Sequence, residues 1–396
     1  MNFPKIGNEA YATRVAALTS KMKQQGIDMV IAFSNLLDPS AVRYFCDFAA
    51  VNESAAIIIM QDGNSTVCSG QASYDYAKIK NRLAGSELKV FPEIGEVSGF
   101  EYNFEGQLDF KQYFEELKSK YKVKKIGVMG RLTFPAIIYN KLKSVFADAE
   151  LIDADGLLYS LRLIKTPDEI AVLNKCWEII SSVFTDVVPQ IRAGMTELEV
   201  QALLESDMLK KGGESYVQAF APMVAAGPEN SYISMCRSTL RKLGEGEIIN
   251  LAAGVCYEGY NGIICSPYAL GKIPQKIKDA VKCAYDALNV ASARMKPGAG
   301  TKEIMTAYTE YLTKYGYIEF CPYGSLHSTG MLECEAPVFS EANDRLIEEN
   351  MCICIDAYFK GMEWGSFRIE DCYAITKNGA GRMTTYNDKA LPKIFF

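Results

Sequence analysis

The segment YGSLHSTGM at residues 323–331 contains His327, the only histidine in the 396-residue chain. Neutral imidazole exchanges protons near physiological pH and is also a frequent metal ligand. The acidic residues Glu333 and Glu335 follow closely along the chain. His327 therefore has three interpretations: a metal ligand, a proton-transfer group, or a core side chain held by a hydrogen bond.

Two carboxylates, Asp356 and Glu370, stand inside the otherwise apolar stretches MCICIDAYF and SFRIEDCYAIT, which predict buried strands. A carboxylate buried without a partner is costly, so each needs a cation, a hydrogen-bond donor or a proton. An ion pair with Arg368 would be the purely structural solution. Together with His327, the two carboxylates would instead make a facial ligand set for a single Mn, Zn or Fe ion.

The twelve cysteines are scattered and include no CxxC pair, which argues against a closed structural zinc site. Because the sequence shows no export signal, we expect these cysteines to be reduced. A nucleophilic role for Cys265, Cys334 or Cys372 would require a nearby base. The ordinary role of such a cysteine is that of a small buried hydrophobic side chain.

The composition indicates a globular protein with large apolar cores, since 49% of the residues are hydrophobic. The net charge of −6, without a Lys/Arg stripe, argues against a nucleic-acid partner. No stretch approaches the roughly 18–20 apolar residues that span a bilayer, and the N-terminus lacks the apolar core of a signal peptide. We therefore expect a cytoplasmic protein that acts on a small molecule, with no nucleic-acid or membrane partner.

The elements that must position the candidate residues fall into two domains. In residues 1–160, predicted helices (10–26, 107–122, 133–147) alternate with predicted strands (28–34, 55–60, 124–130). This alternation predicts an α/β domain with a parallel or mixed sheet.

Residues 161–396 show a different pattern, which predicts an α+β domain with an antiparallel sheet. Two long helices begin after Thr166 and Thr196, and each threonine is followed closely by acidic residues, as helix starts prefer. Two more helices are predicted at 275–295 and 301–315. The predicted strands of this domain lie at 219–227, 246–255, 261–271, 351–359 and 366–376.

Several ordered motifs resemble the creatinase/Xaa-Pro aminopeptidase/methionine aminopeptidase family. SLRLIKTPDEIAVL resembles the family's entry helix, GEIINLAAGVCYEGY its strand pair, and MCICIDAYF and FRIEDCYAITKNGAG its two later strands. The resemblance covers essentially the whole chain. It implies a creatinase-type N-terminal domain, residues 1–160, followed by a catalytic domain with the pita-bread fold, residues 161–396. Fold alone does not settle function.

The family's peptidases hold two divalent ions with two aspartates, one histidine and two glutamates. The resemblance places these ligand positions on Ala252, Ile263, His327, Asp356 and Glu370. Neither Ala252 nor Ile263 has an electron pair to donate, so we expect no dinuclear site. The main expectation is therefore no metal cofactor, and the alternative is one divalent ion such as Mn, Zn or Fe on His327, Asp356 and Glu370.

Other pocket positions also depart from the family. The outer histidine of the peptidases falls on Cys334, and a further substrate-side histidine falls near Ser234. Creatinase is a branch of the family that works without metal. Its catalytic histidine would lie near Glu229, and its substrate-binding glutamate near Cys265. The candidate substrate-binding residues are Cys265, Tyr260, Tyr323, Ser234 and Cys334.

The leading hypothesis is metal-independent hydrolysis of a C–N bond in a small amino-acid-like or guanidino/amidino compound, by an enzyme expected from the resemblance to be a homodimer. His327 would be the general acid/base, Asp356 and Glu370 would bind the substrate cation or orient water, and Glu229 would contribute from a facing loop. One alternative is a one-metal peptidase resembling Xaa-Pro dipeptidase. Another is a non-catalytic small-molecule-binding homologue. This hypothesis is favoured if Glu229 and Glu370 do not converge on His327.

Overall fold

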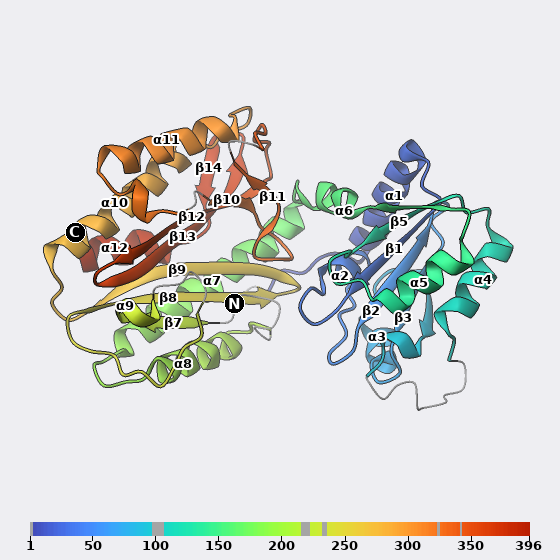
Figure 1. Cartoon of the computed structure of the whole chain (residues 1–396), viewed down its shortest axis with the longest axis horizontal. Helices are drawn as coiled ribbons and strands as arrows, with labels where there is room; N and C mark the ends of the chain where they lie inside the picture. The colour runs from blue at the N-terminus through green and yellow to red at the C-terminus, as the bar shows by residue number, and fades with distance from the viewer. Residues whose placement is uncertain (1–2, 97–106, 215–221, 232–235, 323–324, 341–342) are drawn as a thin grey trace. The chain divides into compact units, whose positions relative to one another are not determined.

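The computed structural model describes residues 3–96, 107–214, 222–231, 236–322, 325–340 and 343–396 (Figure 1). The chain forms two units, Ile6–Arg162 and Leu163–Phe396, and the start of the chain up to Lys5 belongs to the second. Each unit has an apolar core of its own. We call them the N-terminal and the C-terminal unit.

The N-terminal unit contains a mixed six-stranded sheet in the order β4-β3-β2-β1-β5-β6. Its strands are β1 (Met29–Ser34), β2 (Ala55–Met60), β3 (Ser65–Ser69), β4 (Glu87–Val90), β5 (Lys125–Met129) and β6 (Glu150–Asp153). Its helices are α1 (Asn8–Gln25), α2 (Ser40–Cys46), α3 (Tyr74–Lys80), α4 (Phe110–Lys120), α5 (Ala136–Val145) and α6 (Asp155–Arg162). Strands β1 and β2 are buried along their whole length, which explains their continuous apolar sequences.

The C-terminal unit contains an eight-stranded sheet in the order β11-β10-β12-β13-β9-β8-β7, with β14 paired to β13. Every pair in this sheet is antiparallel, as predicted. Its strands are β7 (Met223–Ala226), β8 (Glu247–Tyr257), β9 (Tyr260–Leu270), β10 (Ser325–Ser328), β11 (Glu335–Phe339), β12 (Cys352–Met362), β13 (Gly365–Thr376) and β14 (Gly379–Arg382). Its helices are α7 (Pro167–Val187), α8 (Glu197–Lys210), α9 (Gly227–Asn230), α10 (Gln275–Ser292), α11 (Thr301–Lys314) and α12 (Tyr386–Phe395).

A two-residue turn joins β8 to β9 and fixes the register of the two central strands. Tyr257 pairs with Tyr260, and Glu258 and Gly259 between them both have positive φ angles, 48° and 79°. Two positive φ angles are the property of a type I′ turn, whose twist matches that of the flanking strands. The turn therefore places Ala252 opposite Cys265 with no slip in the ladder.

The helix starts predicted at Thr166 and Thr196 are both capping boxes. The Thr166 hydroxyl accepts from the backbone N–H of Glu169, whose carboxylate accepts in return from the N–H of Thr166. Thr196 and Glu199 repeat the arrangement at α8. Each box satisfies backbone donors that have no partner inside the helix, so these short sequence patterns are sufficient to define where the helices begin.

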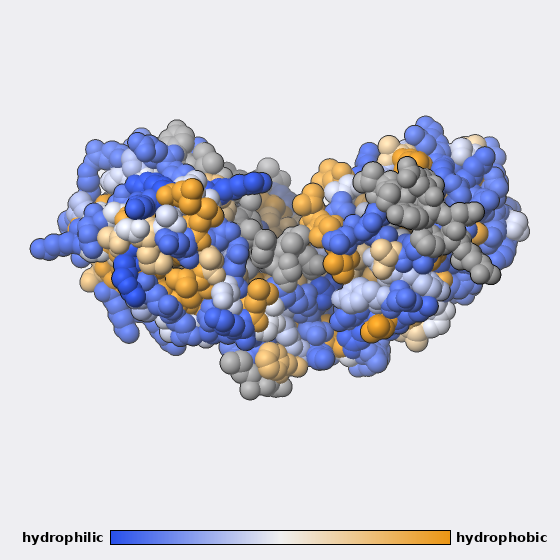
Figure 2. Space-filling view, turned by 90° about the horizontal axis from the view of Figure 1, so that it is seen from below, coloured by the Kyte–Doolittle hydropathy of each residue, from blue (hydrophilic) through white to orange (hydrophobic). Residues whose placement is uncertain are grey.

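The apolar residues are used mainly in the two cores. On the face shown in Figure 2, exposed apolar side chains lie in patches within a largely hydrophilic surface. All twelve cysteines are free. Among the described residues, no helix combines the length and the apolar character that crossing a bilayer requires.

Candidate functional site

One row of paired residues crosses the centre of the C-terminal sheet. The row consists of Ser325, Asp356, Glu370, Cys265, Ala252 and Met223 on six neighbouring strands. In the next row, two residues away, His327 pairs with Cys354, and Cys354 pairs with Cys372. Positions two apart on a strand share a face of the sheet. Residues far apart in sequence, including His327, Cys354 and Glu370, therefore meet on one face.

His327 on β10 uses both of its ring nitrogens. Nδ1 lies 3.1 Å from the carbonyl oxygen of Ser328. Because a carbonyl can only accept a hydrogen bond, Nδ1 carries a proton and donates it. Nε2 lies 3.4 Å from Glu370 Oε1 and 3.7 Å from Glu333 Oε1. Nε2 is therefore the nitrogen that faces the candidate site.

Burial and charge set the protonation of this cluster, in which His327 is 5% exposed and Glu370 is fully buried. Burial alone would lower the pKa of the His327 imidazole. A hydrogen bond to the Cys334 side chain and the negative charge around the ring outweigh that effect and raise this pKa well above its ordinary value. Burial, together with the charge of Glu370, raises the pKa of Glu333 to about 8. In the metal-free protein, His327 is thus charged beside Glu370, and Glu333 keeps its proton at neutral pH.

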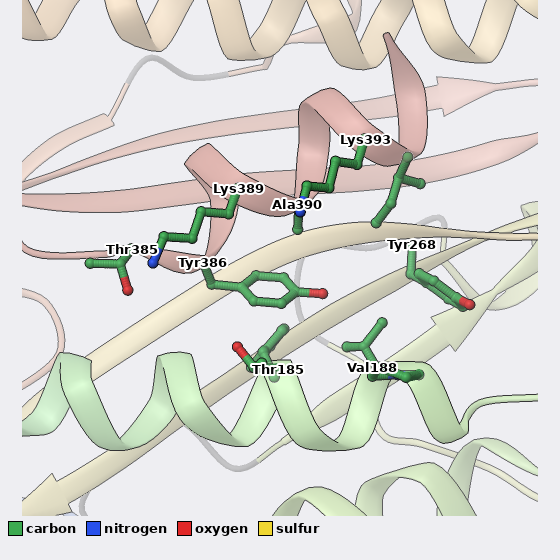
Figure 3. Close-up of a pocket in the computed structure, with 11 residues that line it drawn as sticks. Thr185, Val188, Tyr268, Thr385, Tyr386, Lys389, Ala390 and Lys393 are labelled. Atoms are coloured by element: carbon green, nitrogen blue, oxygen red, sulfur yellow. The ribbon is translucent and has the colours of Figure 1, made fainter.

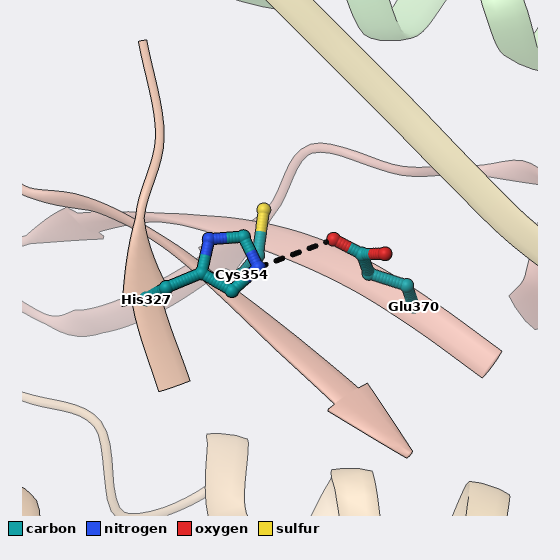
Figure 4. Close-up of side chains that lie close together, drawn as sticks. All are labelled: His327, Cys354 and Glu370. Carbon is teal, nitrogen blue, oxygen red and sulfur yellow. Dashed lines mark ion pairs between the residues drawn. The ribbon is translucent and has the colours of Figure 1, made fainter. Parts of the chain in front are cut away.

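Cys354 on β12 completes a set of three potential metal ligands. The ligand atoms of His327, Cys354 and Glu370 all lie within 4.8 Å of one another, and all three residues are buried. Figure 4 shows the thiol and the carboxylate on the side of the imidazole that carries Nε2. Burial raises the pKa of the Cys354 thiol well above its ordinary value. One nitrogen, one sulfur and one carboxylate are donors that a single borderline-soft divalent ion accepts.

Asp356, for which the sequence left open a metal-ligand role and an ion pair with Arg368, forms the ion pair. Its Oδ1 lies 3.4 Å from Arg368 Nε, and both side chains are buried. The Arg368 guanidinium also lies over the ring of Tyr358, 5.3 Å from its centroid. Separating a buried ion pair is strongly unfavourable. Asp356 is therefore held by Arg368, and Cys354 takes its place among the clustered ligand atoms.

The part of this sheet face on β7, β8 and β9 is apolar. Met223, Ala252, Ile263 and Cys265 are buried together in one small hydrophobic cluster. Cys265 forms its border, since its thiol donates to Glu370 Oε2 over 3.3 Å. The two positions to which the resemblance assigns aspartates, Ala252 and Ile263, thus share a cluster with a residue that contacts Glu370.

Two predicted site residues are engaged outside the cluster of His327, Cys354 and Glu370. Glu229 is exposed on the short helix α9, where its charge acts on Arg241. Tyr260 is buried, and its hydroxyl donates to Glu169 Oε1 over 2.6 Å. Of the two carboxylates expected to converge on His327, Glu370 does so, whereas Glu229 points to solvent. Tyr260 instead ties β9 to the start of α7.

Cys265 and Cys334 are the predicted substrate-binding residues that the structure brings to the cluster. Cys334 is exposed, and its side chain hydrogen-bonds to His327. Ser234 and Tyr323 lie outside the described residues.

Sequence reasoning did not assign roles to Cys354 and Glu333, although both carried a signal. Cys354 precedes Asp356 by two residues on a predicted strand, so the two share a face. Glu333 follows His327 by six residues, and only the turn between β10 and β11 brings its carboxylate back to the imidazole.

Each of the two units matches a known protein family. Residues 171–377 match metallopeptidase family M24, and residues 14–164 match the creatinase/prolidase N-terminal domain. The chain therefore belongs to the M24 family.

Individual relatives match the chain over nearly its whole length. The Xaa-Pro dipeptidase of Pyrococcus furiosus is 26% identical over 94% of this chain and 97% of its own, and the uncharacterized peptidase YqhT of Bacillus subtilis is 25% identical over 96% and 99%. Among solved structures, the X-Pro aminopeptidase of Thermotoga maritima matches with a TM-score of 0.80 at 23% identity, over 94% of this chain and 97% of that one. The prolidase of Pyrococcus horikoshii also reaches 0.80, at 24% identity over 94% and 98%.

These findings confirm the creatinase/aminopeptidase fold, with its α/β N-terminal domain and its α+β pita-bread domain. They also confirm that the chain belongs to a family of hydrolases. They favour the alternative hypothesis, an enzyme resembling Xaa-Pro dipeptidase, over the leading hypothesis of metal-independent hydrolysis.

Proposed function

We propose that this protein hydrolyses small peptides of the Xaa-Pro type with one divalent ion rather than two. The observation that carries the proposal is the convergence of His327, Cys354 and Glu370, whose buried ligand atoms lie within 4.8 Å of one another. The relatives that are named Xaa-Pro dipeptidases support the substrate class.

A pair of ions does not fit the residues present. The methyl group of Ala252 and the sec-butyl group of Ile263 offer no electron pair, and both are buried in an apolar cluster with Met223 and Cys265. A second ion beside Glu370 would therefore face hydrocarbon and a neutral thiol. A single ion fits, because three donors and one open position are the usual arrangement of a catalytic zinc site.

The donor set also indicates which ion would bind. Magnesium and calcium prefer oxygen ligands, whereas a thiol and an imidazole favour zinc or iron. When bound, the ion would supply Lewis-acid polarisation of the carbonyl under attack and activation of water. His327, Cys354 and Glu370 would hold it.

The surrounding groups would orient the ligands and move protons. The Ser328 carbonyl holds the His327 ring so that Nε2 points to the cluster. The Cys265 thiol donates to Glu370 and fixes the orientation of its carboxylate. A hydrogen bond of this kind to a metal ligand typically has a large effect on metal affinity. Glu333, 3.7 Å from Nε2, is the carboxyl group placed to exchange a proton with the leaving amine.

A second candidate function is metal-independent hydrolysis of a C–N bond in a small amino-acid-like or guanidino/amidino compound. The observation in its favour is the position of His327 between two carboxylates, at 3.4 and 3.7 Å. In that mechanism, His327 would be the general acid/base, and Glu370 would bind the substrate cation. Asp356 would contribute less, because Arg368 already neutralises it.

Elemental analysis combined with turnover assays distinguishes the two candidates. Purified protein would be assayed for bound metal and for hydrolysis of Ala-Pro and Leu-Pro, with and without a chelator and added Zn²⁺ or Mn²⁺. We expect one equivalent of metal and turnover that the chelator abolishes. Two equivalents at this site would contradict the single-ion proposal.

Other outcomes select the alternatives. Turnover of amino-acid or guanidino derivatives by metal-free protein, unaffected by the chelator, would establish the second candidate. Binding of these compounds without any turnover would instead identify a non-catalytic homologue. The homodimer expected from the resemblance stays a prediction, which sedimentation equilibrium of the same sample tests.

A further inference from the structure

A pocket separate from the candidate site lies in the C-terminal unit between α7, β9 and α12 (Figure 3). Its volume is about 450 Å³, which is within the range of small-molecule sites in proteins. Its lining contains none of the candidate ligands. The described lining residues are Phe184, Thr185, Val188, Pro189, Tyr268, Thr385, Tyr386, Lys389, Ala390, Lys393 and Ile394.

The body of the pocket is apolar and aromatic. Phe184 and Tyr386 pack edge to face with ring centroids 5.1 Å apart, and Val188 and Ile394 add aliphatic surface. Figure 3 shows the rings of Tyr268 and Tyr386 between α12 and α7. A ring or a short hydrocarbon chain would find van der Waals partners on several sides here.

The charged groups of the described lining are both positive. Lys389 and Lys393 lie four residues apart on α12, so they project from successive turns of one helix face. The described lining includes no aspartate or glutamate. The nearby acids are already paired, Asp186 with Lys211 at 2.7 Å and Asp388 with Arg382. The two ammonium groups are therefore available to an anionic ligand.

We propose that this pocket binds a small organic carboxylate with an apolar body, such as an arylalkanoic or medium-chain acid. The carboxylate would lie between the Lys389 and Lys393 ammonium groups, and the apolar body would occupy the space between the Tyr268 and Tyr386 rings. The proposal does not depend on the activity of the His327 site.

The anchoring of α12 makes a clean test possible. Leu391 and Phe395 are buried in the core of the unit, and Asn387 donates to the carbonyls of Cys265 and Glu370 at 3.2 and 3.3 Å. Lys389 and Lys393 are exposed and contribute nothing to this anchoring. Substituting both lysines should therefore change the charge of the pocket without unfolding the helix.

Isothermal titration calorimetry with 3-phenylpropionate and octanoate tests the proposal on the full chain. We expect one saturable site, at least tenfold weaker binding by the double variant Lys389→Met/Lys393→Met, and unchanged binding by the control Lys360→Met/Lys377→Met. The control removes two exposed lysines that do not line the pocket. Ala390→Phe, which fills the pocket from α12, should abolish binding while leaving the melting temperature unchanged within a few degrees.

Three outcomes would overturn the proposal. The first is an absence of binding up to millimolar acid. The second is equal binding of 3-phenylpropionamide, which lacks the charge, or equal binding by the Lys389→Met/Lys393→Met variant. The third is a dimer that dissociates on that double substitution and excludes the acids, because the pocket would then be occupied by a second copy of the chain.

Discussion

The two halves of one face of the C-terminal sheet have the same backbone geometry but opposite chemistry. On β10, β12 and β13, the inward-facing residues His327, Cys354 and Glu370 bring an imidazole, a thiol and a carboxylate together. On β8 and β9, the inward-facing Ala252 and Ile263 are packed as hydrocarbon. The ladder is continuous from one half to the other, with Glu370 paired to Cys265 and Cys265 to Ala252. One antiparallel sheet therefore carries a polar half and an apolar half without a break in its ladder.

The difference shows which residues the fold requires and which the chemistry requires. Buried charged groups need partners of opposite charge, and in the polar half His327 Nε2 lies 3.4 Å from Glu370 Oε1 and 3.7 Å from Glu333 Oε1. The apolar half needs no such partners and is stabilised by burial alone. The two halves should consequently respond in opposite ways to substitution and to added metal.

The largest effect should come from restoring carboxylates to the apolar half. Ala252→Asp/Ile263→Asp should lower the free energy of unfolding of metal-free protein by about 5 kcal/mol, because a core side chain is lost and two unpaired charges are buried. Added Mn²⁺ should recover part of that loss, roughly 2.7 kcal/mol when the ion is at 100 times its Kd. Urea denaturation with and without Mn²⁺ measures both quantities.

Ile263→Val is the control for that experiment. It removes one methylene without adding a charge, and should cost about 1 kcal/mol while responding to Mn²⁺ only as much as the wild type does. If the double variant is as stable as the wild type without metal, the two positions do not face a buried site, and the contrast between the halves fails.

In the polar half, Glu370→Gln should reduce turnover of the Xaa-Pro dipeptide by about 10²–10⁴-fold, because it removes both a ligand charge and the partner of His327. Glu229→Gln is the matched control, since Glu229 is exposed on α9. The activity of this variant should stay within about twofold of the wild type, because substitutions of exposed residues usually have small effects. Steady-state kinetics measure both activities, and equal losses of turnover in the two variants would argue against the assigned site.

Cys354 and Cys265, on opposite sides of Glu370, allow a direct comparison of the polar and the apolar half. Cys354→Ser should weaken Zn²⁺ binding by about 10–100-fold, because a hydroxyl is a much poorer ligand than a thiolate. Cys265→Ser should change the affinity much less, since the hydroxyl can still donate to Glu370. Competition with a chromophoric chelator gives both affinities. A larger loss of Zn²⁺ affinity in Cys265→Ser than in Cys354→Ser would indicate that Cys265, on the apolar side, is the ligand.

A separate effect concerns pH. The pKa of Glu333 is raised to about 8, so the metal-free native state retains a proton there that the unfolded chain has lost above about pH 4.5. The contribution of Glu333 to stability is thus fully present below pH 4.5 and is lost as the pH rises toward 8. Glu333→Gln should remove roughly 1.4 kcal/mol per pH unit of this negative slope.

Unfolding free energies of wild type and Glu333→Gln, measured between pH 5 and 8 in the presence of a chelator, test that expectation. The two curves should converge at low pH, and the variant should become relatively more stable as the pH rises. Parallel curves would mean that Glu333 is ionised in the native protein and does not share a proton with the His327 cluster.

Much of the fold could be predicted because it depends on local signals. The capping boxes at Thr166 and Thr196 define two helix starts, and the apolar stretches around Asp356 and Glu370 define two buried strands. Short strands such as β10 and β11 could not be found in this way. They are four and five residues long, and they form because β10 pairs with β12 and β11 pairs with β10.

The candidate site was predictable only in part. His327 and Glu370 were identified from their types and from the family motifs, and they do meet. The partner of Asp356 remained open between a metal and Arg368, and the structure gives the ion pair. The surroundings of Glu229 and Tyr260 depend on how α9 and the start of α7 pack against other elements, which no local pattern specifies.

The sequence by itself determined which donors exist and which are missing. One histidine, the buried carboxylates, and the hydrocarbon of Ala252 and Ile263 are properties of composition and motif. Only the tertiary structure decided which donors act together. Ligand atoms from three strands come within 4.8 Å through ladder register, and shifting a strand by one residue would turn each of its side chains to the opposite face. Register depends on pairing between segments far apart in the chain, so Cys354 became a partner of His327 only when β10, β12 and β13 were placed side by side.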